Sequence, residues 1–208
     1  MESGIKGLAD STALVCRDEI LEMLSSEDWT DKGINKGVKC FQRFQGDHKK
    51  VLLGVCLMEF PVEVIARYLV DVRNKESWEP LLLSTHVLFD YGDCKVIQEV
   101  FRAPWPVSQR DFVFVAKREV VGEDVLLVGK SVDVGVPEGR GVVRAEVIMS
   151  GFYLRKLKNE QTEVKYLVCI DPKGNIPMVL ANFASAQQLL CLNRIRTGIS
   201  AQLALNQT

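Results

Sequence analysis

The sequence has little net charge and no long apolar run, and each absence excludes a class of protein. Its 208 residues carry 26 Lys and Arg against 27 Asp and Glu, a formal net charge of −1. This balance gives no general attraction to nucleic acid or to an anionic membrane. No apolar run approaches the roughly 18 residues that a membrane-spanning helix needs. The N-terminus, MESGIKGLADST, lacks the basic and apolar regions of a secretory signal.

Signatures of metal binding and catalysis are also scarce. His48 and His86 are the only histidines, and neither has a partner at ligand spacing, so we expect no metal site and no cofactor. The tripeptide GKS at 129–131 lacks the glycine spacing of a phosphate loop. None of the six cysteines forms a C-x-x-C pair, which predicts free buried thiols in a reducing compartment. What remains is typical of a binding or carrier protein rather than an enzyme.

The length and the apolar share of 47% predict one α+β domain over residues 1–208. An apolar stripe predicts a helix at 10–24, with Leu14, Ile20, Leu21 and Leu24 facing the core. A second helix is expected at 61–70, and a long helix closes the chain at 176–205. Period-two alternation and tight polar turns predict the strands, which are 38–44, 50–59, 84–90, 94–102, 110–120, 124–134, 142–157 and 162–171.

The order of these elements predicts the architecture. A helix, a hairpin, a second helix, a meander and a long helix fit a curved antiparallel sheet of about eight or nine strands around the C-terminal helix. A sheet of that size has difficulty filling its concave side, so we expect a cavity there.

Two loops are candidates for the border of that cavity. In APWPVSQ (103–109), prolines on both sides hold Trp105 in a stiff loop before a strand. There the ring could reach a membrane interface, or it could pack under the C-terminal helix. In GVPEGRG (135–141), glycines around Pro137 would permit hinge motion. If the cavity closes over a ligand, one of these loops or the helix around Leu180 must move.

Five segments stand in the order and spacing of one family. They are WTDKGINKGV (29–38), NKESWEP (74–80), PVSQRDFVFV (106–115), GVVRAE (141–146) and DPKGNIP (171–177). Over about residues 10–200 the chain resembles START domains, the steroidogenic-acute-regulatory-related lipid-transfer family. In motif it is closer to the phosphatidylcholine-transfer-like branch. The resemblance implies a helix-grip fold with an internal hydrophobic tunnel for one lipid, and binding or transfer rather than catalysis.

The resemblance also implies head-group contacts. In the phosphatidylcholine-transfer branch, a basic residue three before a tryptophan and an acidic residue after it reach the head group. Here they are Lys75 and Glu79 around Trp78. The lysine would meet a phosphate and the carboxylate an amine or choline. A solvated pair on one helix is the alternative.

Other positions fit neither ligand branch completely. The positions of the choline cage hold Gln98 and Phe112, and the glutamine weakens such a cage. In the sterol-transfer branch an arginine and an acidic residue polarise the pocket floor. Here the arginine position holds Ala116, and Glu99 lies near the acidic position.

The local sequence pattern adds further candidate contacts. Alternation on the RDF strand places Phe112, Phe114 and Ala116 on one face. We expect Arg110 to pair with Asp111, and Arg144 to pair with Glu146. The candidate lipid contacts are Lys75, Trp78, Glu79, Gln98, Glu99, Phe112, Phe114, Ala116, Arg144, Met178 and Phe183, and the candidate gate or membrane contacts are Trp105, Pro137 and Leu180.

The sequence therefore predicts a cytoplasmic, monomeric protein at the periphery of membranes that binds one lipid and transfers it. A phospholipid is slightly favoured over a sterol, and no nucleic-acid partner is expected. Two alternatives keep the fold. The chain could be a lipid-sensing module of a larger protein, or an enzyme on a small hydrophobic substrate.

Overall fold

The computed structural model describes residues 2–46, 49–103, 107–176 and 187–205. The described helices are α1 (Glu2–Ser25), α2 (Val62–Val70), α3 (Lys75–Trp78), α5 (Cys191–Leu205) and the 3₁₀ turn η1 (Val72–Asn74). The strands are β1 (Thr30–Asn35), β2 (Val38–Gln45), β3 (Lys49–Met58), β4 (Leu82–Asp90), β5 (Cys94–Phe101), β6 (Gln109–Val121), β7 (Asp124–Ser131), β8 (Val142–Arg144), β9 (Glu146–Lys156) and β10 (Thr162–Asp171).

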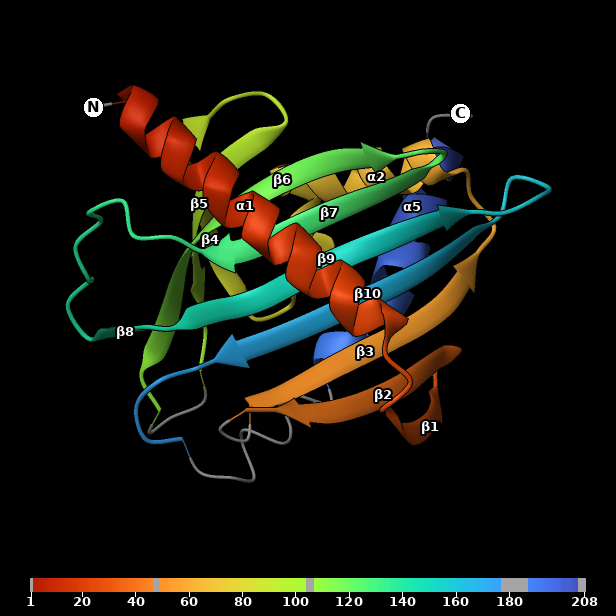
Figure 1. The fold of residues 1–208 in the computed structure, drawn as a ribbon, viewed down its shortest axis with the longest axis horizontal. Helices are drawn as coiled ribbons and strands as arrows, with labels where there is room; N and C mark the ends of the chain where they lie inside the picture. Colours follow the sequence, from red (N-terminus) through yellow and green to blue (C-terminus); the bar gives the residue numbers. More distant parts are fainter. Residues whose placement is uncertain (1, 47–48, 104–106, 177–186, 206–208) are drawn as a thin grey trace.

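The strands form one curved sheet, which confirms the predicted fold class (Figure 1). Its order is β1-β2-β3-β10-β9-β7-β6-β5-β4, and the neighbours along this path are antiparallel. The short β8 pairs with β6 in parallel. The meander from β4 to β10 therefore joins the β1–β3 hairpins through the pairing of β3 with β10.

Two features raise the number of described strands to ten. The stretch SSEDWTDKGINKG (25–37) is rich in turn-forming residues, yet it contains β1, whose residues are all exposed and show no apolar alternation. The expected strand 142–157 is divided at Ala145, whose N–H donates to the Asp111 carbonyl at 2.9 Å. Before this residue β8 pairs with β6, and after it β9 pairs with β7.

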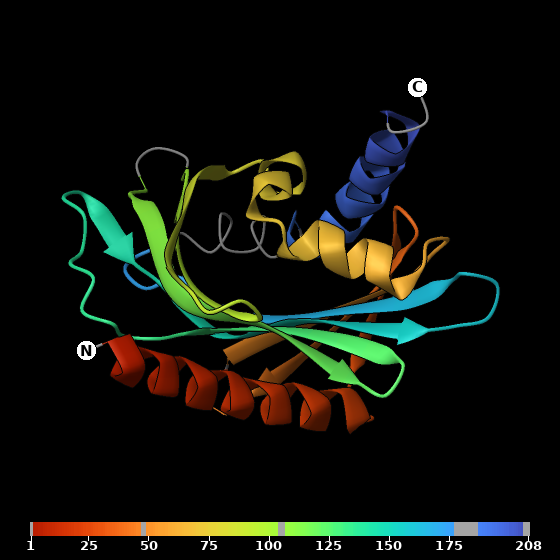
Figure 2. The ribbon, with the colours of Figure 1, turned by 90° about the horizontal axis from the view of Figure 1, so that it is seen from above.

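Helix α1 lies along the convex face of the sheet (Figure 2). It begins eight residues earlier than predicted, and its stripe differs. Ile20 is buried, but Leu14 and Leu21 are 45% and 36% exposed. Three of the five buried residues of the helix are small, namely Ala9, Ala13 and Cys16. The other two are Ile20 and Met23. Small side chains are favoured on this side of α1 because the helix lies close to the strands. At Gly151, an added Cβ would overlap Ile20.

Helices α2, α3 and α5 lie on the concave face (Figure 2). Ile65 of α2 and Ile195 and Ile199 of α5 share one buried core with the sheet. Helix α5 approaches so closely that an added Cβ at Gly198 would overlap the Tyr68 hydroxyl. The long C-terminal helix is thus described over Cys191–Leu205, and positions 177–186 of the prediction lie outside the described residues.

The cysteines are free thiols, as predicted, and all but the partly exposed Cys40 are buried. Burial raises the pKa of Cys16 to about 11, which keeps that thiol in its unreactive protonated form.

Candidate functional site

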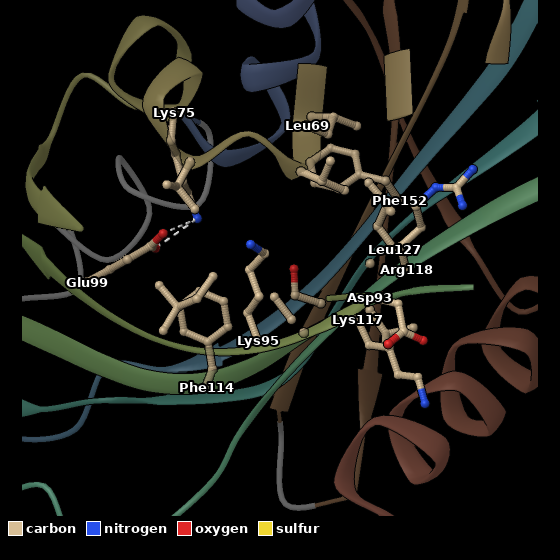
Figure 3. A pocket seen from close by; sticks show the side chains of 18 of the residues that line it. Leu69, Lys75, Asp93, Lys95, Glu99, Phe114, Lys117, Arg118, Leu127 and Phe152 are labelled. Carbon is tan, nitrogen blue, oxygen red and sulfur yellow. Dashed lines mark hydrogen bonds and ion pairs between the residues drawn. The ribbon is translucent and has the colours of Figure 1, made fainter. Parts of the chain in front are cut away.

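A cavity of about 310 Å³ lies between the concave face of the sheet and the segment from α2 to α3 (Figure 3). This volume is at the low end of the ~300–1,000 Å³ typical of ligand pockets. The residues around it are Leu69, Val70, Val72, Lys75, Trp78, Gly92, Asp93, Lys95, Ile97, Glu99, Phe114, Ala116, Lys117, Arg118, Leu127, Val128, Gly129, Ser150, Gly151 and Phe152.

A row of small residues in three neighbouring strands leaves the space open. Ala116 of β6 stands opposite Gly129 of β7, which stands opposite Ser150 of β9. None of the three carries a side chain long enough to reach the helices above. Larger apolar side chains, among them Phe114 and Phe152, surround this row. The cavity therefore follows from the residue sizes at one register of the sheet.

One end of the cavity contains an ion pair whose carboxylate is buried. Lys75 reaches from α3 to Glu99 on β5 (Figure 3), with its Nζ 2.7 Å from Oε1 and 2.8 Å from Oε2. Glu99 is only 2% exposed. Its Oε1 has no hydrogen bond of good geometry despite the short ion-pair distance. The carboxylate of the pair is thus enclosed by protein, and the 21% exposed Lys75 side chain is its more accessible member.

Aromatic rings enclose the same ammonium group. Lys75 Nζ lies 5.4 Å from the centre of the Trp78 ring and 5.3 Å from that of Phe114. Both distances are within the range of cation–π attraction. The cation therefore meets one carboxylate and two aromatic rings.

Glu79, the predicted partner of Lys75, follows α3 outside the cavity lining. Burial raises the pKa of its carboxyl to about 7, although the positive charges of Lys75 and Arg194 act against the rise. Arg194 of α5 donates to the Trp78 carbonyl at 2.6 Å, so the C-terminal helix contacts the chain segment that carries the ion pair.

At the far end of the cavity each positive charge has its own acidic partner. Arg118 pairs with Glu63 at 2.7 Å. Lys95 pairs with Asp90. On β5 the alternating positions Lys95, Ile97 and Glu99 line the cavity in a row.

Gln98 and Arg144 lie elsewhere. Both bind Asp111, the arginine through two bonds of 2.9 Å and the amide at 2.8 Å. Burial acts to raise the pKa of Asp111, but these hydrogen bonds outweigh it and hold the pKa below its usual value. Because Gln98 neighbours Glu99 on one strand, the two side chains point to opposite faces of the sheet.

Both ion pairs expected from local sequence are therefore wrong. Arg110 donates instead to the carbonyls of Ser108, Pro172 and Lys173, which ties β6 to the turn after β10. Glu146 pairs with Lys173 at 2.9 Å. Sequence neighbours could not reveal these partners, because all but Ser108 come from distant segments.

The candidate residues divide into three groups. Five line the cavity, namely Lys75, Trp78, Glu99, Phe114 and Ala116. Five described ones lie outside its lining, namely Glu79, Gln98, Phe112, Pro137 and Arg144. Four lie outside the described residues, namely Trp105, Met178, Leu180 and Phe183.

Two of these outlying residues have other contacts. Phe112 packs edge-on against Phe101 with ring centres 5.5 Å apart. Pro137 is exposed, and its carbonyl accepts a hydrogen bond from Arg144 at 3.4 Å.

The sequence did not point to four cavity residues, which are Lys95 and Ile97 on β5, Leu127 on β7 and Phe152 on β9. Alternation back from Glu99 could have found the first two. The others depend on the register between strands.

Within the described part of the chain, no group of three or more His, Cys, Asp or Glu side chains is placed to hold a metal ion. The same residues include no helix long and apolar enough to cross a membrane. The cavity and its ion pair are thus the main chemical feature that the structure offers.

Comparison with known proteins gives the class. The START domain profile matches residues 18–202, so the chain belongs to the START domain family. Human StAR-related lipid transfer protein 5 superposes with a TM-score of 0.85 at 15% identity, over 94% of this chain and 98% of that one. At that identity the likeness shows the fold alone.

Two curated relatives are similar in sequence. An uncharacterized protein of Pseudomonas aeruginosa is 28% identical over 159 residues, which is 76% of this chain and 79% of the relative. Human START domain-containing protein 10 is 27% identical over 159 residues, 74% of this chain and 53% of the relative. The chain thus matches about half the length of the human relative.

Proposed function

We propose that the chain binds one lipid in the cavity of the concave face and exchanges it with membranes. The observation that carries this proposal is a mainly apolar cavity that contains the ion pair of Lys75 with the buried Glu99. Burial of an apolar ligand would drive binding at about 25 cal/mol per Å². Membership of the START family and the structural likeness to a lipid transfer protein support it.

The polar head of the lipid would meet Lys75 and Glu99 rather than Lys75 and Glu79. An oxygen on the ligand can accept a hydrogen bond from the Lys75 ammonium, because the Lys75 side chain is 21% exposed whereas that of Glu99 is only 3% exposed. The sequence favours a phospholipid slightly over a sterol. The cavity volume of about 310 Å³ is small for a ligand pocket. A two-chain phospholipid would therefore require the walls to move apart more than a sterol or a single chain would.

Native mass spectrometry of the purified protein tests binding. The protein is incubated with phospholipid vesicles and, separately, with vesicles that contain cholesterol, and the bound lipid is then extracted and identified. We expect a one-to-one adduct. Absence of any adduct from either incubation would contradict the proposal.

Transfer is tested by the movement of a quenched fluorescent lipid from donor to acceptor vesicles. A carrier used in amounts far below the lipid should move many lipids per protein molecule. Binding without transfer would favour the sensor alternative. The hydrogen bond from Arg194 to the Trp78 carbonyl supports that alternative, since it connects the cavity wall to α5.

A further inference from the structure

We propose that Lys75 fills a cation-binding box of the cavity and thereby excludes ligands with an ammonium head. The box consists of Glu99, Trp78 and Phe114. Lys75 would then determine which head groups the protein accepts. This inference rests on the proposed lipid binding and specifies the chemistry of the ligand.

The geometry of the box is that of a cation site. Its carboxylate lies 2.7 Å from the ammonium nitrogen, and its two ring centres lie 5.4 and 5.3 Å away. Aromatic faces together with a carboxylate are the groups that attract quaternary and primary ammonium ions. The group found there belongs to the chain itself.

Because the carboxylate of the box is buried, the box needs one cation to balance its charge. Glu99 is 2% exposed and Trp78 is 4% exposed, so the carboxylate has little water to stabilise its charge. A buried carboxylate without a partner is strongly unfavourable. The Lys75 side chain is only 21% exposed, so a second cation beside it would meet a weakly screened like charge. An ammonium head could enter only by displacing the lysine, whereas a neutral or anionic head could use it as a donor.

Lys95 provides the matched comparison. It lines the same cavity from the same strand as Glu99, but it pairs with Asp90 outside the cavity lining. Its side chain is 28% exposed and that of Asp90 is 51% exposed. Removing the charge of Lys95 therefore changes the charge of the cavity without emptying the box.

The first experiment uses two small probes of similar shape, choline and its uncharged analogue 3,3-dimethylbutan-1-ol. Their affinities are measured by calorimetry for the wild type, Lys75→Met, Lys95→Met and Lys75→Arg. We expect Lys75→Met to bind choline at least about tenfold more tightly than the alcohol, because the emptied box attracts a cation. The other three proteins should show no preference for choline.

The second experiment repeats the comparison with lipids. Vesicles contain equal amounts of a monoacylglycerol and a lysophosphatidylcholine with the same acyl chain, and the bound lipids are extracted and counted. Wild type, Lys75→Arg and Lys95→Met should take up the monoacylglycerol preferentially. Lys75→Met should shift the ratio toward the choline lipid by about tenfold.

Clear results would overturn the inference. Choline preference in the wild type would do so, as would equal binding of both probes by Lys75→Met, or the same shift in Lys95→Met. If Lys75→Met does not fold alone, the probes are added during refolding. Rescue by choline and not by the alcohol supports the inference, and rescue by neither overturns it.

The two proposals fail in different ways. If the wild type takes up neither lipid, the proposed function fails, while the probe experiment still measures the box. If the wild type binds lipid and Lys75→Met keeps the wild-type selection, lipid binding stands and the role of Lys75 is refuted.

Discussion

Both faces of the sheet contain small residues, but a helix packs tightly against them on the convex face and a cavity lies above them on the concave face. On the convex face, Ile20 of α1 occupies the space above Gly151 so completely that a Cβ there would overlap it. On the concave face, the small residues Ala116, Gly129 and Ser150 stand in register beneath the cavity. Small residues thus bring a helix close on one face and leave room for a ligand on the other.

Buried carboxylates show the same contrast. Asp111 accepts hydrogen bonds from both Arg144 and Gln98, so its oxygens are satisfied within the protein. Glu99 has Lys75 as its ion-pair partner, and its Oε1 lacks a good hydrogen bond. The first arrangement fixes β8 to the sheet, and the second places a partly exposed ammonium at the cavity.

The largest expected effect comes from opening the sealed face. Ile20 is fully buried under α1. Ile20→Ala should lower the free energy of unfolding by about 2–5 kcal/mol, because it removes apolar contacts and leaves a void. Urea unfolding followed by circular dichroism measures the loss.

Leu21→Ala is the matched control, since Leu21 is the next residue of the same helix and is 36% exposed. It should change the free energy of unfolding by less than about 1 kcal/mol. Equal losses in the two variants would mean that α1 does not seal the sheet in the way described.

The next effect concerns Glu79, next to the ion pair on the concave face. Its pKa is raised from 4.5 to about 7 by burial. Between these pH values the folded protein keeps a proton that the unfolded chain has released, so the free energy of unfolding falls as pH rises through this window. Glu79→Gln should remove that part of the fall and be more stable than the wild type at pH 8 by about 3 kcal/mol.

Thermal and urea unfolding from pH 4 to pH 8 test this expectation. Below pH 4.5 the glutamine variant and the wild type should have nearly equal stability. Glu76→Gln is the control, because Glu76 is exposed on α3, the short helix that Glu79 follows. A similar gain at pH 8 in the control would point to surface charge instead of burial.

Most of the fold could be predicted because it depends on local patterns. The meander strands alternate, and their turns carry polar residues and glycines. Strand β1 could not be predicted, since its residues are all exposed and its pairing with β2 leaves no apolar signal. The predicted buried stripe of α1 was wrong. Large apolar residues usually mark the buried side of a helix, but here the close approach of α1 to the sheet favours the small residues Ala9, Ala13 and Cys16.

The site was predictable only within one strand or helix. Alternation on β6 placed Phe114 and Ala116 on the cavity face, and the family motif pointed to Lys75 and Trp78. The partner of Lys75 was missed because Glu99 lies 24 positions away, while Glu79 is close in sequence. Pairing across elements depends on sheet register and helix placement, which no single segment contains.

The smallest expected change in stability comes from filling the open face. Ala116 and Val115 are neighbours on β6 and point to opposite faces, Ala116 into the cavity and Val115 into the core under α1. Ala116→Leu adds three carbon atoms where space exists, so it should alter the free energy of unfolding by less than about 1 kcal/mol. It should nevertheless reduce lipid uptake at least about tenfold, because it occupies volume that the ligand needs.

Val115→Leu is the matched variant with the opposite outcome. It adds a single carbon atom to a fully buried position, so it should cost about 1–3 kcal/mol through overpacking while the folded fraction still takes up lipid. Urea unfolding and native mass spectrometry of both variants measure the two quantities together. Equal costs for Ala116→Leu and Val115→Leu would show that the concave face is as tightly filled as the convex one, and the cavity would then not be available to a ligand.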